Sequence, residues 1–213
     1  MVFLQQKEFT PGSRQYSDVK LVERELLRLE RIVNDFLMFA RPGDCRLAPM
    51  TADVLLREIE TLLGPELAET GTKLVVDEAP ALPIDADQEQ IEQVLINLVR
   101  NASEAIDRNG VVKLRARLAH RRLAGKETDV VILEVEDNGK GMSAETQKRL
   151  FDPFFTTKDI GTGLGLSIAA RIVQSHAGVL EYQTAPGLGT TFGIVLPFRN
   201  GHADRSARTR KSV

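Results

Sequence analysis

The stretch Asp137-Asn138-Gly139-Lys140-Gly141-Met142 joins the end of a predicted strand to a glycine-rich turn. Residues 130–137 before it are predicted as a strand, in which successive side chains point to opposite faces. Asp137 shares the face that carries Val131, Leu133 and Val135. The strand therefore delivers a carboxylate from its apolar side into a glycine-rich turn, and a carboxylate in that position needs a hydrogen-bond donor.

Two interpretations of Asp137 are open from these residues. An adenine amino group would supply the donor, and Gly139 and Gly141 would let the base approach the backbone. Alternatively, Asp-Asn-Gly is ordinary turn chemistry at the end of a strand. A similar stretch, Gly187-Leu188-Gly189-Thr190-Thr191-Phe192, enters the last predicted strand, and by itself it is typical of a hairpin turn.

A second glycine-rich stretch, Gly161-Thr162-Gly163-Leu164-Gly165-Leu166-Ser167-Ile168, leads into a helix predicted over residues 165–176. Backbone amides of such a loop at a helix N-terminus bind phosphate oxygens. No Gly-Lys-Ser/Thr follows, which excludes a Walker A loop, and no apolar strand leads in, as a dinucleotide fingerprint would require. The preceding segment contains Phe151, Phe154, Phe155 and Lys158, and it could equally be an apolar patch that anchors a loop.

The third cluster lies on the helix predicted over residues 88–108, with Asp87 as N-cap and Gln90 three residues on. Asn97, Asn101 and Glu104 share one face of this helix. Asn is a poor residue inside helices, and its amide oxygen suits Mg²⁺. A solvated helix face would also carry these side chains.

The remaining elements alternate between helices and strands. A helix is predicted over residues 51–63, with a possible kink at Gly64-Pro65 before it ends near Gly71. Further strands are predicted over Lys73–Asp77 and over residues 111–118, 178–184 and 190–197. Because hairpins outnumber crossovers in this order, an α+β fold with a mixed sheet is favoured over a doubly wound one.

Residues 16–40 carry a heptad pattern. Apolar residues step by three and four through Val19, Val22, Leu26, Leu29, Val33, Phe36 and Ala40. Such a stripe predicts a long helix that packs against a partner helix. The helix is expected to end at Arg41-Pro42-Gly43.

Composition limits the function classes. The 213 residues are 42% hydrophobic and 27% charged, as in globular proteins. Residues 199–213 hold five basic residues and one acidic residue, which leaves 23 basic and 29 acidic residues in the rest. This acidic body argues against a nucleic-acid partner. We expect no membrane span, since no apolar run is long enough. The single cysteine, Cys45, favours a cytoplasmic location.

In their order along the chain, these clusters resemble the N, G1, F, G2 and G3 boxes of the sensor histidine kinases. These kinases belong to the Bergerat-fold superfamily, together with gyrase and the mismatch-repair ATPases. The resemblance spans residues 14–198, and Phe-Phe-Thr-Thr-Lys over residues 154–158 is similar to the nitrogen-regulation branch. It implies a two-layer α/β sandwich over residues 42–198, with a mixed sheet covered by helices. A partial dimerisation hairpin over residues 1–41 would precede it, and residues 199–213 would form a basic disordered tail.

The resemblance also implies roles for single residues. Asn101 would ligate Mg²⁺ with Asn97 nearby, and Lys158 would reach the γ-phosphate of ATP. Asp137 would accept from the adenine amine, supported by Thr190, and Gly139 and Gly141 would admit the purine. The phosphates and the loop over them would be held by Phe154, Phe155, Gly161, Thr162, Gly163, Leu164, Gly165 and Leu166. For Lys158, a solvated loop charge is the alternative, and His176 is expected to be structural.

Two departures from the family pattern modify this expectation. Hydrolysing relatives carry a water-activating Glu one turn before the Mg²⁺ ligand, and Asn97 stands there, so ATP would be held for transfer. The phosphoacceptor His-Glu-x-x-Asn-Pro-like box does not occur: His120, His176 and His202 all lie elsewhere. Residues 1–9 resemble the last turns of the first hairpin helix, so we expect the acceptor histidine upstream of Met1.

The resulting hypothesis is the ATP-binding catalytic domain of a two-component sensor histidine kinase. It would transfer the γ-phosphate to a histidine outside this chain, for relay to an aspartate of a response regulator receiver domain. A complete hairpin would make it a homodimer. The alternatives are a non-catalytic, ATP-dependent regulatory module and a serine kinase of the anti-sigma type. Residues 142–162 are expected to be the least ordered part of the domain without nucleotide.

Overall fold

The computed structural model describes residues 13–40, 44–77, 79–107, 110–158 and 161–199. A five-stranded sheet in the order β2-β4-β5-β7-β6 forms one layer. Its strands are β2 (Thr72–Val76), β4 (Gly110–Leu123), β5 (Lys126–Asp137), β6 (Val179–Ala185) and β7 (Gly189–Pro197). β2 and β4 are parallel and the other pairs are antiparallel. The predicted mixed sheet is therefore confirmed.

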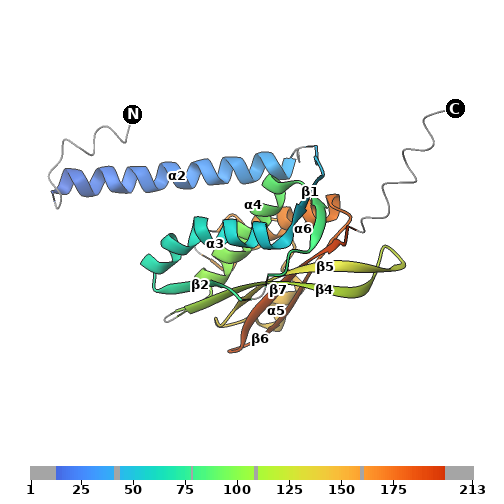
Figure 1. Ribbon diagram of the computed structural model, residues 1–213. Coiled ribbons are helices and arrows are strands. Elements are labelled where there is room, and N and C mark those ends of the chain that lie inside the picture. Colours follow the sequence, from blue (N-terminus) through green and yellow to red (C-terminus); the bar gives the residue numbers. More distant parts are fainter. Residues whose placement is uncertain (1–12, 41–43, 78, 108–109, 159–160, 200–213) are drawn as a thin grey trace.

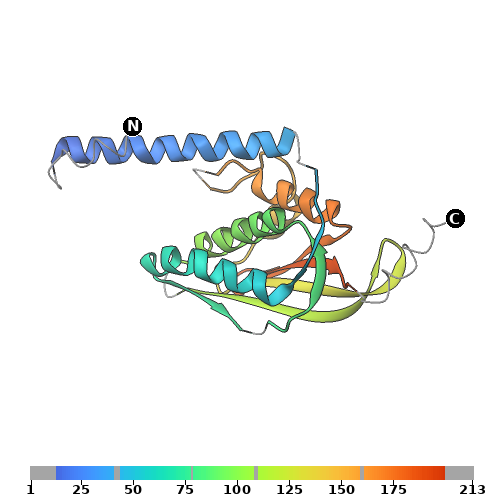
Figure 2. The ribbon, with the colours of Figure 1, turned by 45° about the horizontal axis from the view of Figure 1, so that its top comes forward.

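Three helices form the second layer on one face of the sheet (Figure 1, Figure 2). They are α3 (Ala52–Glu69), α4 (Gln88–Glu104) and α6 (Gly165–Ser175). The inner side chains of β5, Val131, Leu133 and Val135, are at most 1% exposed and belong to the same core as Leu95 and Leu98 of α4. The two-layer sandwich follows from this shared core.

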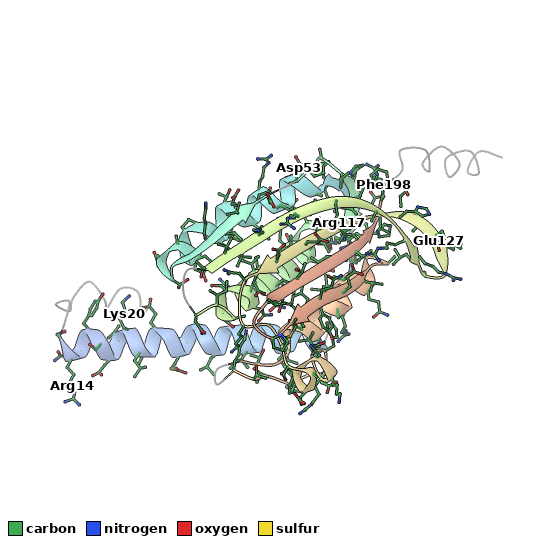
Figure 3. All side chains as sticks on the ribbon, turned by 90° about the horizontal axis from the view of Figure 1, so that it is seen from below. Arg14, Lys20, Asp53, Arg117, Glu127 and Phe198 are labelled. Carbon is green, nitrogen blue, oxygen red and sulfur yellow. The ribbon has the colours of Figure 1, made fainter. Side chains whose placement is uncertain are left out.

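The opposite face of the sheet carries charged side chains. Figure 3 looks at this face, with Arg117 labelled on it. Arg117 pairs with Glu134 at 2.8 Å, and Arg115 pairs with Glu136 at 3.0 Å across β4 and β5. Cross-strand pairs of opposite charge stabilise a solvated sheet surface. Charged pairs and a small buried cluster of Val130, Ile132 and Val195 therefore make up this face within the described residues.

Helix α4 begins as predicted and ends earlier than predicted. The Asp87 side chain caps it by accepting from the Gln90 amide. The helix ends at Glu104 rather than at residue 108. The Ala105 carbonyl accepts instead from the Lys140 amide at 3.0 Å, so this tertiary bond takes an acceptor that a longer helix would use.

α3 continues through Gly64-Pro65 to Glu69, close to the predicted end near Gly71, because Leu63 and Leu67 extend its buried stripe. Two short strands, β1 (Ala48–Thr51) and β3 (Pro83–Ala86), pair antiparallel and were not predicted. Each contains a proline, which normally argues against a strand. A short helix, α5 (Ala144–Lys148), was also missed.

The predicted long helix is present as α2 (Arg14–Ala40), which lies alongside the sandwich near α6 (Figure 1). Its stripe residues Val22, Leu26, Leu29, Val33 and Phe36 are each about half exposed, between 47% and 56%. The stripe is thus largely uncovered in the single chain. Within the described residues, no helix is both long and apolar enough to cross a membrane.

His176 joins α6 to the start of α4. The side chain is only 3% exposed, and its Nε2 accepts from the Asp87 amide at 3.0 Å. Its Nδ1 lies 2.7 Å from the Ile172 carbonyl oxygen, so Nδ1 carries the hydrogen and donates. Both ring nitrogens are used within the protein, which supports the structural role expected for His176.

We expect His176→Phe to lower the free energy of unfolding by about 1–3 kcal/mol, because the Asp87 amide loses its acceptor. Urea unfolding of the full chain measures this change. The control is His120→Phe, whose side chain is 64% exposed, and which should leave the urea concentration at the midpoint of unfolding nearly unchanged. Equal losses in both variants would contradict the structural role.

Candidate functional site

A cleft of about 970 Å³ opens between α4, α6, the turn after β5 and the start of β7. One of its walls is the lid, our name for residues 143–158. The residues predicted as site residues that line the cleft are Asn97, Asn101, Asp137, Gly141, Phe155, Lys158, Gly161, Thr162, Gly163, Gly165, Leu166 and Thr190. Segments that are far apart in the sequence thus meet around one cavity.

One end of the cleft is built around Asp137, which is 5% exposed. Its Oδ1 accepts from the Gly139 amide at 2.8 Å and from the Thr190 amide at 3.2 Å. Asp137 and Thr190 are register partners of β5 and β7, so the sheet itself brings them together. Burial raises the pKa of the Asp137 carboxyl, and these two backbone bonds partly counteract the rise.

Glycine is required where the turn after β5 passes its neighbours. Gly141 has a φ of +65°, and a Cβ there would collide with the Ala185 carbonyl. Thr184 holds the next residue, because its hydroxyl accepts from the Met142 amide at 3.0 Å. Thr184 was not among the predicted site residues. Its pairing with Thr190 across β6 and β7 is the sequence signal that would have indicated it.

The other end of the cleft is built from α4 and the start of α6. Asn101 Nδ2 donates to Asn97 Oδ1 at 3.3 Å, whereas Asn97 Nδ2 is buried without a partner. A Cβ on Gly165 would collide with the Asn97 amide, so the start of α6 can approach Asn97 this closely only because residue 165 is glycine. α6 begins at Gly165 without a side-chain cap, which leaves its first amides available to an anion.

This end fits a nucleotide phosphate with Mg²⁺. The unpaired Asn97 Nδ2 and the uncapped start of α6 both offer N–H donors to phosphate oxygens. Among the described residues, no group of three His, Cys, Asp or Glu side chains could hold a metal ion. A Mg²⁺ here would therefore rely on the Asn101 amide oxygen, water and phosphate oxygens, which matches its usual coordination.

Lys158 of the lid reaches across to α4. Its Nζ donates to Asn101 Oδ1 at 2.7 Å and forms an ion pair with Glu104. Glu104 also lines the cleft, although the sequence analysis placed it on the helix face without a role. The Lys158 charge is thus directed at the α4 face rather than simply solvated.

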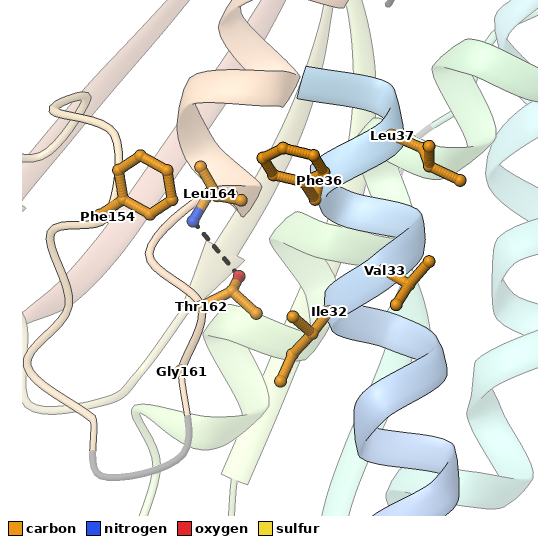
Figure 4. A pocket seen from close by; sticks show the side chains of 8 residues that line it. All are labelled: Ile32, Val33, Phe36, Leu37, Phe154, Gly161, Thr162 and Leu164. Carbon is orange, nitrogen blue, oxygen red and sulfur yellow. Dashed lines mark hydrogen bonds between the residues drawn. The ribbon is translucent and has the colours of Figure 1, made fainter. Parts of the chain in front are cut away.

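The three phenylalanines of the lid lie in three different environments. Phe151 packs edge-on to Tyr182 of β6, with ring centroids 6.0 Å apart. Phe155 lines the cleft and carries the Arg149 guanidinium 4.3 Å above its ring. Phe154 lies outside the cleft, and with Leu164 it lines a smaller apolar pocket against Phe36 of α2 (Figure 4). Gly139 does not line the cleft directly, and its amide contributes through Asp137.

Comparison with known families matches residues 86–200 to the model of the histidine kinase-, DNA gyrase B- and HSP90-like ATPases. The chain belongs to this ATPase family. The match begins at the residue before Asp87, the cap of α4, and runs through Phe198 at the end of the sheet. It therefore covers both ends of the cleft in this ATPase family member.

Individual relatives of this family member are sensor histidine kinases. The sensor histidine kinase ZraS of Klebsiella oxytoca is 35% identical over 199 residues, which are 92% of this chain and 42% of ZraS. The chain thus spans about two fifths of that relative. The structure of full-length ShkA in complex with AMPPNP is similar with a TM-score of 0.75 and 28% identity, over 93% of this chain and 42% of ShkA. The histidine kinase ThkA, solved with the response regulator protein TrrA, gives 0.70 and 26%, over 92% and 55%.

We expect Asp137→Asn to leave the fold intact and to change how stability depends on pH. A raised pKa means that the folded protein favours the protonated carboxyl, so the wild type loses stability as pH rises above the ordinary Asp range near 4. Asn keeps an acceptor for the two backbone amides without the buried charge. The gain in stability of the variant over the wild type should therefore be larger at pH 7 than at pH 4, in urea unfolding at both values. A gain that shrinks at pH 7 would contradict this account.

Proposed function

We propose that the chain is the catalytic domain of a sensor histidine kinase, which binds ATP with Mg²⁺ in the cleft and transfers the γ-phosphate to a histidine. One observation carries this proposal. A buried carboxylate at one end and an Asn pair beside an uncapped helix start at the other line the same cleft. Adenine and polyphosphate need this pair of environments.

At the adenine end, Asp137 Oδ1 is committed to the two backbone amides. We assign Oδ2 to the adenine amine, which donates to it. The Thr190 hydroxyl lies 3.0 Å from the Thr184 hydroxyl, so a fixed pair of oxygens borders this end. Because Asp137 is buried, its hydrogen bond to a purine amine forms in a region of low dielectric and is strengthened accordingly.

At the phosphate end, the first amides of α6 and the free Asn97 Nδ2 would donate to phosphate oxygens. Asn101 Oδ1 would hold Mg²⁺, which neutralises charge on the transferred phosphate when bound. Lys158 would bind the terminal phosphate from the lid side. Asn97 stands where a general base would have to act, and an amide cannot take a proton, so water is left inactive and ATP is preserved for transfer.

Two partners belong to this proposal. A response regulator receiver domain would accept the phosphate from the histidine, which is supported by the ThkA structure solved with TrrA. A second copy would cover the exposed stripe of α2, if a complete hairpin is present, because a heptad stripe that is half exposed favours a partner helix.

We expect Asn101→Ala to abolish most of the Mg²⁺ dependence of ATP binding, since the variant lacks the proposed metal ligand. Asp137→Asn should weaken ATP binding by about 1.5–3 kcal/mol at any Mg²⁺ concentration, as for a hydrogen bond to a charged group. Titration calorimetry with and without Mg²⁺ separates the two effects. Unchanged Mg²⁺ dependence in the first variant, or unchanged affinity in the second, would refute the corresponding assignment.

We expect no acid-labile phosphate on this chain when it is incubated alone with labelled ATP and Mg²⁺. His176 is buried with both ring nitrogens in use, and His120 lies on β4, outside the residues that line the cleft. His202 falls outside the described residues. A helical hairpin carrying a His box, supplied separately, should become labelled. If this chain becomes labelled without the hairpin, one of its own histidines acts as the phosphoacceptor, and the prediction is wrong.

A further inference from the structure

The contact between Lys158 and α4 uses the same oxygen that the proposed Mg²⁺ needs. Lys158 Nζ donates to Asn101 Oδ1 at 2.7 Å. An amide oxygen has two lone pairs, but an ammonium group on one and a divalent cation on the other would be close neighbours of like charge and would repel each other. Binding of Mg²⁺ at Asn101 therefore drives Lys158 away from this oxygen.

Glu104 is the group that keeps Lys158 in this position. It is the last residue of α4 and lies three residues after Asn101, so both side chains point to the same helix face. Its carboxylate forms an ion pair with Lys158 Nζ. The C-terminal end of a helix also carries partial negative charge, which attracts a cation in the same direction.

The local charge explains why a cation is needed here. Without Lys158, the Glu104 carboxylate, the Asn101 oxygen and the end of α4 would all present negative charge to an approaching polyphosphate. The side chains of Lys158 and Glu104 are 38% and 50% exposed. Water therefore screens the attraction between the two charges, and the ion pair is weak. A weak pair suits a contact that must break each time a nucleotide enters.

We infer that Glu104 is a positioning residue, which holds Lys158 as a stand-in cation on Asn101 until Mg²⁺ with nucleotide displaces it. Displacement frees the Lys158 ammonium within reach of the terminal phosphate. Replacement of Lys158 by Mg²⁺ also couples the lid to the metal site, because Lys158 belongs to the lid and Asn101 belongs to α4. This inference rests on the proposed function for its metal and nucleotide, but the Lys158–Glu104 pair exists without either.

The pair is tested first without nucleotide, by hydrogen exchange of the full chain. Glu104→Gln should speed exchange of the lid amides, residues 143–158, by about two- to fivefold, because a contact that closes the lid is weakened. Asp85→Asn is the matched control. It removes a pair with Arg199 of nearly the same exposure, 48% and 39%, away from the cleft, and should leave lid exchange unchanged. Equal lid exchange in Glu104→Gln and the wild type would overturn the inference.

A charge exchange separates the pair from other effects of the substitution. Glu104→Lys and Lys158→Glu should each speed lid exchange, and the double variant should return it to within about twofold of the wild type. A double variant that exchanges as fast as the single ones would overturn the inference. This result does not depend on nucleotide binding, so it decides the pair even if the proposed function fails.

Competition with Mg²⁺ is tested with ADP, which has no γ-phosphate to draw Lys158 away. Lys158→Met removes the charge and keeps the length, so Mg²⁺ meets no competitor at Asn101. The Mg²⁺ concentration that half-saturates its effect on ADP binding should fall about three- to tenfold. An unchanged or higher concentration would overturn the inference. If the wild type binds no ADP at any Mg²⁺ concentration, it is the proposed function that fails.

Discussion

Burial of the Asp137 carboxylate sets the geometry of one end of the cleft. One of its oxygens accepts from Gly139 in the turn after β5 and from Thr190 at the start of β7. These bonds tie the turn to the neighbouring strand and offset part of the cost of burying a charge. Asp137 is only 5% exposed although burial of a carboxylate is unfavourable. Such buried ionisable groups concentrate at functional sites.

Helix α4 carries the second half of the site because it is fixed at both ends. Its N-terminus is capped by Asp87, whose own amide donates to the buried His176 of α6. At its other end, the Ala105 carbonyl accepts from the turn that follows Asp137. Its apolar face packs on the sheet, and the half-buried Asn97 and Asn101 lie beside that face and line the cleft. The contacts at its two ends thus fix α4, and with it this wall of the cleft, relative to the turn that follows Asp137.

Much of this arrangement could be predicted from the sequence, because it follows from periodicity. The face of β5 that carries Asp137, the cap at Asp87 and the shared face of Asn97 and Asn101 are all local properties of a strand or helix. The resemblance to the ordered sequence boxes of the sensor histidine kinases also predicted which of these clusters form one site.

The remainder depended on tertiary contacts that no local pattern records. The end of α4 at Glu104 is set by a bond to a residue 35 positions later in the chain, Lys140 to Ala105. The place of Phe154 against α2, rather than in the cleft, follows from how the lid folds back. The hold of Glu104 on Lys158 joins two elements that are 54 residues apart. The contact of Glu104 with Lys158 was missed for the same reason.

Recognition of the adenine amine by Asp137 can be measured as the preference of the protein for ATP over inosine triphosphate. Inosine carries a carbonyl oxygen where adenine carries the amine, so an ionised Asp137 would face an acceptor instead of a donor. We expect the wild type to bind ATP with Mg²⁺ at least tenfold more tightly than inosine triphosphate, in line with about 1.4 kcal/mol or more for a charged hydrogen bond. Asp137→Asn should abolish or invert this preference, because its amide can donate to the carbonyl. Equal affinity of the wild type for both nucleotides would contradict the account.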